Sequence, residues 1–207
     1  NILALTFTNK AAQEMRNRVH VLLEQDALSA SGLTVSTFHA FCARVLRQWG
    51  DHIIGTTSFT IYDTADQKNA MKAAIKSAEL SDSNWRPASV LAAISDAKNK
   101  LIDVDTFESE ASDFYTKSIA KMYRAYDKIL RSNDAVDFDD LLLHTARLLD
   151  IDEEVRQSLE NRYQYLMIDE YQDTNHTQFV IANKIAANHR NICVVGDSDQ
   201  SIYAFRG

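Results

Sequence analysis

The stretch YLMIDEYQD at residues 165–173 decides the fold, because an apolar run of strand length stops there at three carboxylates within five positions. Such a run is typical of a strand buried on both faces of a parallel sheet, and α/β ligand sites form at the carboxyl ends of such strands. We therefore expect Asp169 and Glu170 at a strand tip that faces a crevice. Such an aspartate suits Mg²⁺, and a neighbouring acid can orient or deprotonate a water that attacks a phosphate. A polar loop after a core strand is the alternative, and the motif alone does not decide between them.

The composition indicates a globular, helix-rich chain. Its 207 residues, 45% of them hydrophobic, can bury a core in one or two domains, and one proline and five glycines give no support for long flexible linkers. The net charge of −7 argues against a surface that is basic throughout, but it neither requires nor excludes DNA binding.

Cysteine usage and the absence of long apolar runs favour a cytoplasmic protein. Cys42 and Cys193 are unclustered and give neither a metal-binding spacing nor a disulfide framework, so we expect a reduced compartment. No apolar run approaches the roughly 18 residues that span a membrane, and no signal-like amino terminus is present. The chain begins at Asn1, without methionine, inside an expected strand, so we expect a fragment.

Strand and helix patterns alternate at the amino-terminal end. An apolar run at residues 2–7 is followed by apolar residues at helical spacing through residue 23, and a strand at 33–36 precedes a helix that reaches residue 49. The joint at residues 6–10 carries groups that suit a phosphate at a helix start, although simple capping with Phe7 in the core is the alternative. Thr37 caps the second helix, and His39 lies off its apolar stripe, where it contacts a phosphate or faces solvent.

The middle of the chain is predicted to be helical from residue 64 to residue 162, after a short extended piece at 59–62. Thr64 and Gln67 form an expected capping box, and Pro87 suits the first turn of the next helix. The acidic residues at 137–140 resemble a metal site, but Asp137 serves as a helix cap and the first helical turn favours negative charge. We therefore interpret this cluster as structural.

The carboxyl-terminal end repeats the alternation. A helix at about 174–188 leads to a second buried-type strand at 191–195, which ends in the acid-bearing stretch 196–207. Two successive strands thus end in acid-bearing tips, as expected if both feed one crevice of a parallel sheet.

Four separated motifs stand out along the chain, namely LTFTNKAA at residues 5–12, TFH at 37–39, LMIDEYQDTN at 166–175 and VGDSDQSIYAFRG at 195–207. In this order they resemble motifs Ia, Ib, II and III of the superfamily 1 DNA helicases of the UvrD, PcrA and Rep type. Motifs II and III together are specific to this group, and residues 136–142 resemble it more loosely.

The resemblance implies an α/β fold, namely part of a RecA-like parallel-sheet motor domain of the P-loop NTPase class with an inserted all-helical subdomain. Residues 1–36 and 163–207 are expected to form part of the first motor domain, 1A, and residues 37–162 the helical subdomain 1B. The phosphate loop G-x-x-x-x-G-K-[ST], the Walker A motif, occurs nowhere in the chain, and the family places it upstream of Asn1. We therefore expect no ATPase activity from this chain alone, and apolar sheet edges that need partners.

The resemblance also implies roles for single residues. Asp169 binds Mg²⁺, and Glu170 is the general base or water-orienting acid for hydrolysis of ATP. Gln200 senses the γ-phosphate, and Arg206 pairs with the catalytic acid and couples nucleotide state to DNA. Aromatic rings stack on single-stranded bases, a contact that tolerates any sequence and needs little positive charge. Many relatives carry tryptophan where Phe205 stands, so stacking is expected to be weaker there. The stacking residues are Phe7, Tyr203 and Phe205, and the residues that hold the DNA backbone are Thr8, Asn9, Thr37 and His39.

The expected function is that of a fragment of an ATP-dependent DNA helicase with 3′ to 5′ polarity. Its parent would couple Mg-ATP hydrolysis to translocation on single-stranded DNA and unwinding at duplex junctions in repair or replication, with repair proteins as further partners and no membrane association. Three alternatives remain open: a helicase-nuclease subunit of the RecB or AddA kind, a noncatalytic DNA- or protein-binding module, and a Mg²⁺-dependent nuclease built on the acids alone. The last leaves Gln200 and the aromatic pair at 203 and 205 unexplained.

Overall fold

The computed structural model describes residues 1–25, 31–78 and 85–200, apart from the side chain of Ser198. The chain divides into two compact units: unit 1 comprises residues 1–45 and the part from residue 145 onward, and unit 2 comprises residues 46–144. The chain leaves unit 1 within α2 (Phe38–Trp49) and returns within α7 (Phe138–Ile151). The predicted α/β class with a parallel sheet is confirmed.

Unit 1 is built on a four-stranded parallel sheet in the order β2-β1-β5-β6. The register pairs Thr6 with Thr37, Leu5 with Ile168, and Ile168 with Val194. Because all pairs are parallel, the four carboxyl ends lie at the same edge of the sheet. The strands are β1 (Ile2–Thr6), β2 (Leu33–Thr37), β5 (Tyr165–Ile168) and β6 (Ile192–Val194).

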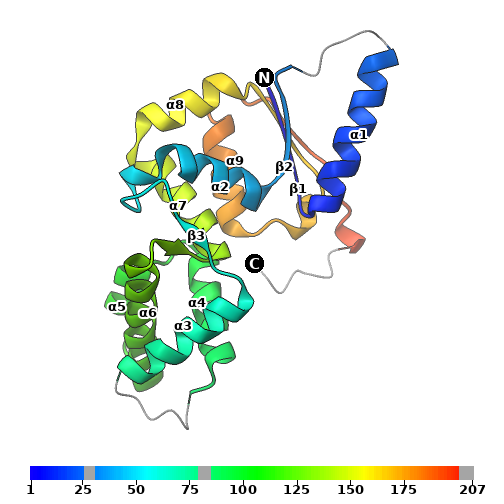
Figure 1. The fold of residues 1–207 in the computed structure, drawn as a ribbon. Helices are drawn as coiled ribbons and strands as arrows, with labels where there is room; N and C mark the ends of the chain where they lie inside the picture. The colour runs from blue at the N-terminus through cyan, green and yellow to red at the C-terminus, as the bar shows by residue number, and fades with distance from the viewer. Residues whose placement is uncertain (26–30, 79–84, 201–207) are drawn as a thin grey trace. The chain divides into compact units, whose positions relative to one another are not determined.

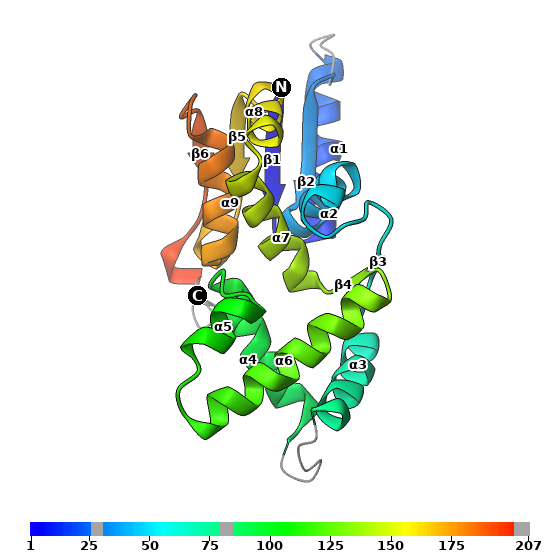
Figure 2. The same cartoon turned by 90° about the vertical axis from the view of Figure 1, so that its left-hand side faces the viewer.

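Helices cover the two faces of this sheet unequally. Helix α1 (Asn9–Gln25) lies on one face, and α8 (Glu153–Arg162) and α9 (His176–Ala186) lie on the other (Figures 1 and 2). Ala12 of α1 packs on Ala4 and Val35, which belong to β1 and β2. Helix α1 therefore covers the β1–β2 half of its face, and the β5–β6 half receives no helix from the described residues.

The prediction that β5 and β6 are buried on both faces is wrong for the described chain. Tyr165 and Met167 of β5 are 54% and 46% exposed, and Ile192 and Val194 of β6 are also exposed. Leu166 and Ile168, which alternate with the exposed side chains of β5, are buried. The physical reason is the limited cover given by α1, together with the position of β6 at the edge of the sheet. The apolar side chains of these strands favour burial, and the described residues do not cover all of them.

Unit 2 is helical apart from a two-stranded parallel sheet that pairs Thr60 with Ala135 and Ile61 with Val136. The sequence indicated an extended piece at 59–62 but not its partner strand. The helices enclose a core in which Met71, Met122 and Tyr126 are fully buried. Besides the ends of α2 and α7, the described residues of the unit form η1 (Gly50–His52), β3 (Thr60–Ile61), α3 (Thr64–Ser77), α4 (Pro87–Asn99), α5 (Val104–Glu110), α6 (Phe114–Ser132) and β4 (Ala135–Val136).

Two predicted helix starts in unit 2 have different outcomes. Pro87 occupies the first turn of α4, as predicted. The capping box of α3 is shifted by one residue, because Asp63 and not Thr64 is the cap: its carboxylate accepts hydrogen bonds from the backbone N–H groups of Ala65 and Asp66. Aspartate caps helices better than threonine, which explains the shift.

The boundaries between the two units differ from those drawn on the sequence. They fall at residues 45/46 and 144/145, whereas the sequence placed them at 36/37 and 162/163. The beginning of α2 and all of α8 belong to unit 1, where Phe41 packs edge-on against Tyr163 at 5.8 Å between ring centroids. Whether the units correspond to subdomains 1A and 1B remains a proposal.

None of the helices in the described part of the chain is both long and apolar enough to cross a membrane.

Candidate functional site

The carboxyl-terminal edge of the sheet in unit 1 gathers the predicted site residues that the structure describes. Phe7, Thr8 and Asn9 follow β1, and Thr37 ends β2. Asp169 and Glu170 follow β5, and Gln200 lies in the short helix η3 (Ser198–Gln200) after β6. Parallel α/β sheets bind their ligands at this edge, so the four tips form the candidate site.

Asp169 and Glu170 differ in their environment although they are adjacent. Asp169 is half-buried, and its backbone N–H donates to the carbonyl of Leu5 at 2.9 Å, which ties the tip of β5 to β1. Within the described ranges, its carboxylate makes no hydrogen bond or ion pair. Glu170 is exposed and takes the left-handed backbone conformation, with φ 54° and ψ 43°. A carboxylate held at a strand tip without a partner is available to a cation.

The donor set at this edge fits Mg²⁺ bound together with a phosphate ligand. Mg²⁺ prefers oxygen ligands and is usually held by one or two carboxylates plus water and substrate phosphates, without a full protein cage. Asp169 supplies such an oxygen. Among the described residues no group of three or more His, Cys, Asp or Glu side chains could hold a metal by itself. Asp169 therefore offers a single carboxylate at this edge, which suits a metal that takes its other ligands from water and phosphate.

The tip of β6 is ordered around the carboxylate of Asp197. Its Oδ1 accepts a hydrogen bond from the backbone N–H of Asp199 at 3.0 Å, and its Oδ2 accepts one from Nε2 of Gln200 at 2.8 Å. The predicted phosphate-sensing amide is thus fixed by a neighbour to which the sequence analysis gave no role.

The tip of β1 combines helix capping with exposed polar groups. The Oγ1 of Thr8 accepts a hydrogen bond from the backbone N–H of Ala11 at 3.1 Å, so Thr8 caps α1. Asn9 is exposed at the first position of the helix, and Phe7 is half-buried. The capping alternative holds for Thr8, whose hydroxyl hydrogen can still be donated to a phosphate oxygen.

The tip of β2 is less open than the sequence analysis expected. The Oγ1 of Thr37 accepts from the backbone N–H of Ala40 at 3.2 Å and caps α2, and Thr37 is only 7% exposed. His39 is half-buried in the first turn of the same helix. The Thr37 side chain is therefore engaged in capping and offers little exposed surface to a phosphate.

Three predicted site residues, Tyr203, Phe205 and Arg206, lie outside the described residues.

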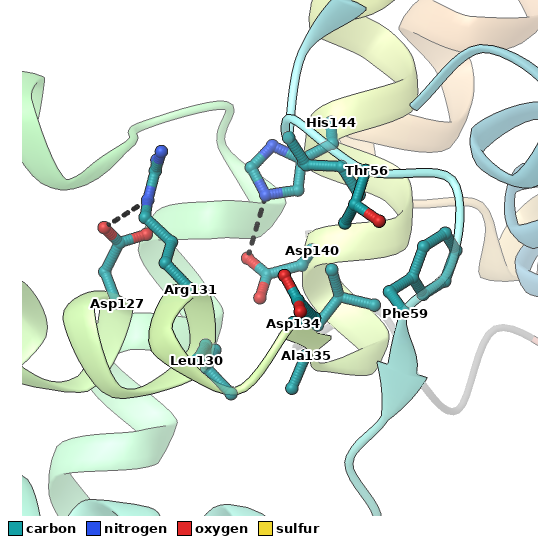
Figure 3. Close-up of a pocket in the computed structure, with 11 residues that line it drawn as sticks. Thr56, Phe59, Asp127, Leu130, Arg131, Asp134, Ala135, Asp140 and His144 are labelled. Carbon is teal, nitrogen blue, oxygen red and sulfur yellow. Dashed lines mark hydrogen bonds and ion pairs between the residues drawn. The ribbon is translucent and has the colours of Figure 1, made fainter. Parts of the chain in front are cut away.

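A small cavity of about 30 Å³ lies in unit 2 and is lined by none of the predicted site residues. His144 and Asp140 point into it, and the Arg131–Asp127 ion pair lies beside it (Figure 3). Nδ1 of His144 is buried without a hydrogen-bond partner. Burial lowers the pKa of His144 to about 4, with the charges of Lys98 and Arg131 acting in the same direction. A cavity of this size holds a water molecule but not a nucleotide.

The acidic cluster of residues 137–140 is structural, as predicted, but for a further reason. Nζ of Lys98 lies 2.7 Å from Oδ2 of Asp137 and 2.7 Å from Oδ1 of Asp140, and all three residues are buried. The hydroxyl of Tyr126 donates to Asp137 at 3.1 Å. Asp137 and Asp140 also form a reciprocal capping box at the start of α7. Sequence reasoning missed Lys98 because no local signal connects residues 39 positions apart.

Sequence reasoning also missed Gln172 and Gly196, which lie among the predicted site residues. Nε2 of Gln172 donates to Oε2 of Glu170 at 2.7 Å, and Oε1 of Gln172 accepts from the backbone N–H of Asp197 at 3.0 Å. A Cβ atom on Gly196 would lie 2.6 Å from that Oε1 atom. Gln172 lies in motif II and Gly196 in motif III, each next to an aspartate in the sequence. That position was the signal that could have identified them.

Comparison with known proteins agrees with this arrangement. The model of the UvrD/REP helicase N-terminal domain family matches residues 1–207. Proteins called ATP-dependent DNA helicase PcrA are similar to the chain: one from Staphylococcus epidermidis is 42% identical and one from Bacillus subtilis (strain 168) is 43% identical, each over 207 residues. Each match covers all of this chain and 28% of the relative. The chain thus spans about a quarter of the length of these relatives, and it belongs to the UvrD/REP helicase N-terminal domain family.

Proposed function

We propose that the chain is part of an ATP-dependent DNA helicase, in which the carboxyl-terminal edge of the unit 1 sheet forms one half of the ATP-hydrolysis site. The observation that carries this proposal is the convergence of Asp169, Glu170 and Gln200 at the adjacent tips of β5 and β6. Membership of the UvrD/REP helicase N-terminal domain family and the similarity to proteins called ATP-dependent DNA helicase PcrA support it.

In this proposal each described residue has a defined task. The carboxylate of Asp169, which has no hydrogen-bond or ion-pair partner among the described residues, would hold Mg²⁺, and this ion would neutralise charge on the phosphates of ATP. Glu170 orients the attacking water or takes its proton. Gln200 presents its amide to the γ-phosphate, with Asp197 as its anchor. Arg206 is proposed to pair with Glu170 and to couple the nucleotide to DNA.

DNA is proposed to bind across the same edge. Thr8 and Asn9 at the start of α1, and Thr37 and His39 at the start of α2, contact the backbone through hydroxyl, amide and N–H groups. Single-stranded bases stack on aromatic rings, which suits a chain of net charge −7 because stacking needs little positive charge. The stacking rings are those of Phe7, Tyr203 and Phe205.

The finer features of the function are also proposals. We assign unit 1 to motor subdomain 1A and unit 2 to helical subdomain 1B, and we infer 3′ to 5′ translocation, duplex unwinding, a role in repair or replication with repair proteins as partners, and a cytoplasmic location. A nuclease built on the acids alone is disfavoured, since it would leave Gln200 and the aromatic pair at 203 and 205 without a role. A helicase-nuclease parent and a noncatalytic parent remain the alternatives.

The test is DNA-stimulated ATP hydrolysis by the full-length protein and its Glu170→Gln variant. Loss of a general base lowers kcat by about 10²- to 10⁴-fold. Binding of a fluorescent ATP analogue and of single-stranded DNA is expected to persist, because Glu170→Gln leaves Asp169 and the DNA contacts in place. The isolated 207-residue chain is expected to give no turnover, because its sequence has no phosphate loop.

Wild-type turnover by Glu170→Gln would remove the assigned role of Glu170. A full-length protein that binds DNA but hydrolyses no ATP would favour the noncatalytic module instead.

A further inference from the structure

Gln172 connects the tips of two neighbouring strands through the two ends of one side-chain amide. Its Nε2 donates to Oε2 of Glu170, at the tip of β5, and its Oε1 accepts from the backbone N–H of Asp197, at the tip of β6. The orientation of the amide is fixed by chemistry, because a carboxylate only accepts and a backbone N–H only donates. The side chain therefore has a single hydrogen-bonded orientation in which both contacts form.

The connection continues through Asp197 to Gln200. Oδ2 of Asp197 accepts from Nε2 of Gln200 at 2.8 Å, and its Oδ1 accepts from the N–H of Asp199. An unbroken series of hydrogen bonds thus runs from Glu170 through Gln172 and Asp197 to Gln200. The proposed catalytic acid and the proposed phosphate-sensing amide are joined by two residues that contact neither phosphate nor DNA in the proposed function.

The backbone around this series is shaped to allow it. Glu170 takes a left-handed conformation that is uncommon for a residue with a Cβ atom and persists only where surrounding contacts hold it. Such contacts are present: the N–H of Tyr171 donates to the carbonyl of Val195 at 2.9 Å, and the N–H of Val195 donates to the carbonyl of Ile168 at 2.8 Å. The turn that presents Glu170 is therefore pinned to the tip of β6.

Gly196 provides the space that Gln172 needs. A Cβ atom at this position would approach Oε1 of Gln172 to 2.6 Å, which is closer than real Cβ contacts, whereas the next nearest atoms, the backbone nitrogens of residues 171 and 172, lie at 3.1 and 3.2 Å. The atom with the severe overlap is the end of a flexible side chain. A methyl group at position 196 would therefore displace the Gln172 amide before it moves the backbone.

Resting on the proposed ATPase function, we propose that Gln172 and Asp197 are positioning residues that hold the Glu170 carboxylate in place and join it to Gln200. One oxygen of Glu170 accepts from Gln172, and the other, which has no hydrogen bond within the described ranges, can face the attacking water. A change at Gln200 on binding or loss of a γ-phosphate reaches Glu170 through Asp197 and Gln172.

The proposal is tested in the full-length protein with two variants that break the series in different ways. Gln172→Leu removes both hydrogen bonds at nearly constant size, and Gly196→Ala leaves Gln172 in the sequence but occupies its space. Loss of a partner that orients a reacting or metal-binding group typically lowers activity by about 10- to 100-fold. We expect both variants to lower kcat for DNA-stimulated ATP hydrolysis by this factor, with the KM for ATP and the melting temperature unchanged.

A matched control lies on α8. Nε2 of Gln157 donates to Oε1 of Glu153 at 2.9 Å, so the same two residue types make the same contact on an exposed helix surface. Gln157→Leu is expected to retain wild-type kcat and KM. A Glu170→Gln/Gln172→Leu double variant is expected to be no slower than Glu170→Gln alone, because Gln172 acts through Glu170.

We call the hydrogen-bond series from Glu170 through Gln172 and Asp197 to Gln200 the relay. The outcomes separate a failure of the relay from a failure of the proposed ATPase function. If wild-type protein shows no DNA-stimulated turnover, or Glu170→Gln retains it, the proposed function fails and the relay fails with it. If Glu170→Gln is inactive but Gln172→Leu and Gly196→Ala match wild type, only the relay is overturned. A rise in KM in place of a fall in kcat, or a double variant slower than Glu170→Gln, also overturns it, since either shows that Gln172 acts elsewhere.

Discussion

The chain holds two acidic clusters that look alike in sequence and differ in their surroundings. In unit 2, Asp137 and Asp140 are buried against Lys98, whose ammonium lies 2.7 Å from both carboxylates. In unit 1, Asp169 and Glu170 stand at a strand tip, and no ion pair within the described residues reaches either of them. The first cluster includes its own cation, Lys98, whereas the second has no counter-ion among the described residues.

The difference teaches how to separate structural from functional acids. Burial alone lowers the pKa of Lys98, but Asp137 and Asp140 raise it well above its ordinary value, so the lysine stays charged. Burial and the neighbouring Asp140 raise the pKa of Asp137. Groups that compensate one another in this way are part of the fold. Acids without a counter-ion, at an edge where ligands bind, are available for a metal or a substrate.

The largest expected effect follows from removing the buried cation. Lys98→Met leaves two buried carboxylates without their cation, and breaking a buried ion pair in this way destabilises proteins by about 3–5 kcal/mol. The expected result is faster amide hydrogen exchange in α4, α6 and α7 of the full-length protein, measured by mass spectrometry.

Lys100→Met is the matched control, since Lys100 pairs with Asp96 at 2.8 Å and both side chains are more than half exposed. Surface changes of this kind alter the free energy of unfolding by less than about 0.5 kcal/mol. Equal exchange in the two lysine variants would contradict a structural role for the buried cluster.

The fold was predictable where local patterns suffice. The four strands of unit 1, most of the helices and the parallel sheet follow from apolar spacing, and Asp137 was assigned correctly from its capping position. Contacts between residues far apart in the sequence were not predictable in this way. Neither the pairing of β3 with β4 nor the contact of Lys98 with Asp137 leaves a local signal. The exposure of Met167 escaped prediction because burial depends on which helix covers a strand, and α1 covers only β1 and β2.

The candidate site shows the same limit on a smaller scale. The motifs located Asp169, Glu170 and Gln200, and the parallel register explains why they meet at one edge. The sequence did not reveal the direction of the side chains at the strand ends. In the sequence, Gln172 is not distinguished from other polar residues. In the structure, its amide forms hydrogen bonds with both Glu170 and the backbone N–H of Asp197.

An intermediate effect is expected from pH, again within the buried cluster. Burial, followed by the charges of Lys98 and Arg131, lowers the pKa of His144 to about 4, whereas an unfolded histidine titrates near 6.5. Protonation therefore favours the unfolded state: the stabilisation is fully present above about pH 6.5 and is lost as pH falls toward about 4, by roughly 3 kcal/mol in total. Asp137, whose pKa is raised, contributes with the opposite sign, so the quantity to compare is the difference between wild type and variant.

The measurement is the free energy of opening of α7, from hydrogen exchange corrected for intrinsic rates, at several values between pH 4 and pH 7. His144→Gln is expected to reduce the loss of stability over this range. His20→Gln, at an exposed position of α1, is the control and is expected to keep the full loss. If the two variants follow the same curve, a group other than His144 carries the pH dependence.

The smallest effect on stability is expected at Asp169, and this is the sharpest contrast with Lys98. Asp169→Asn removes a half-buried carboxylate that has no partner among the described residues and lies next to Glu170, so it relieves like-charge repulsion and breaks no contact. The free energy of opening of β5, from hydrogen exchange, is expected to stay within about 0.5 kcal/mol of wild type. DNA-stimulated ATP turnover is expected to be lost, because an amide is a poor substitute for a charged Mg²⁺ ligand. An acidic cluster is functional if removing a charge lowers turnover but leaves stability unchanged. In the structural cluster, by contrast, Lys98→Met is expected to lower stability. If Asp169→Asn instead destabilises the protein and leaves turnover intact, both acidic clusters belong to the fold, and Asp169 is not the Mg²⁺ ligand.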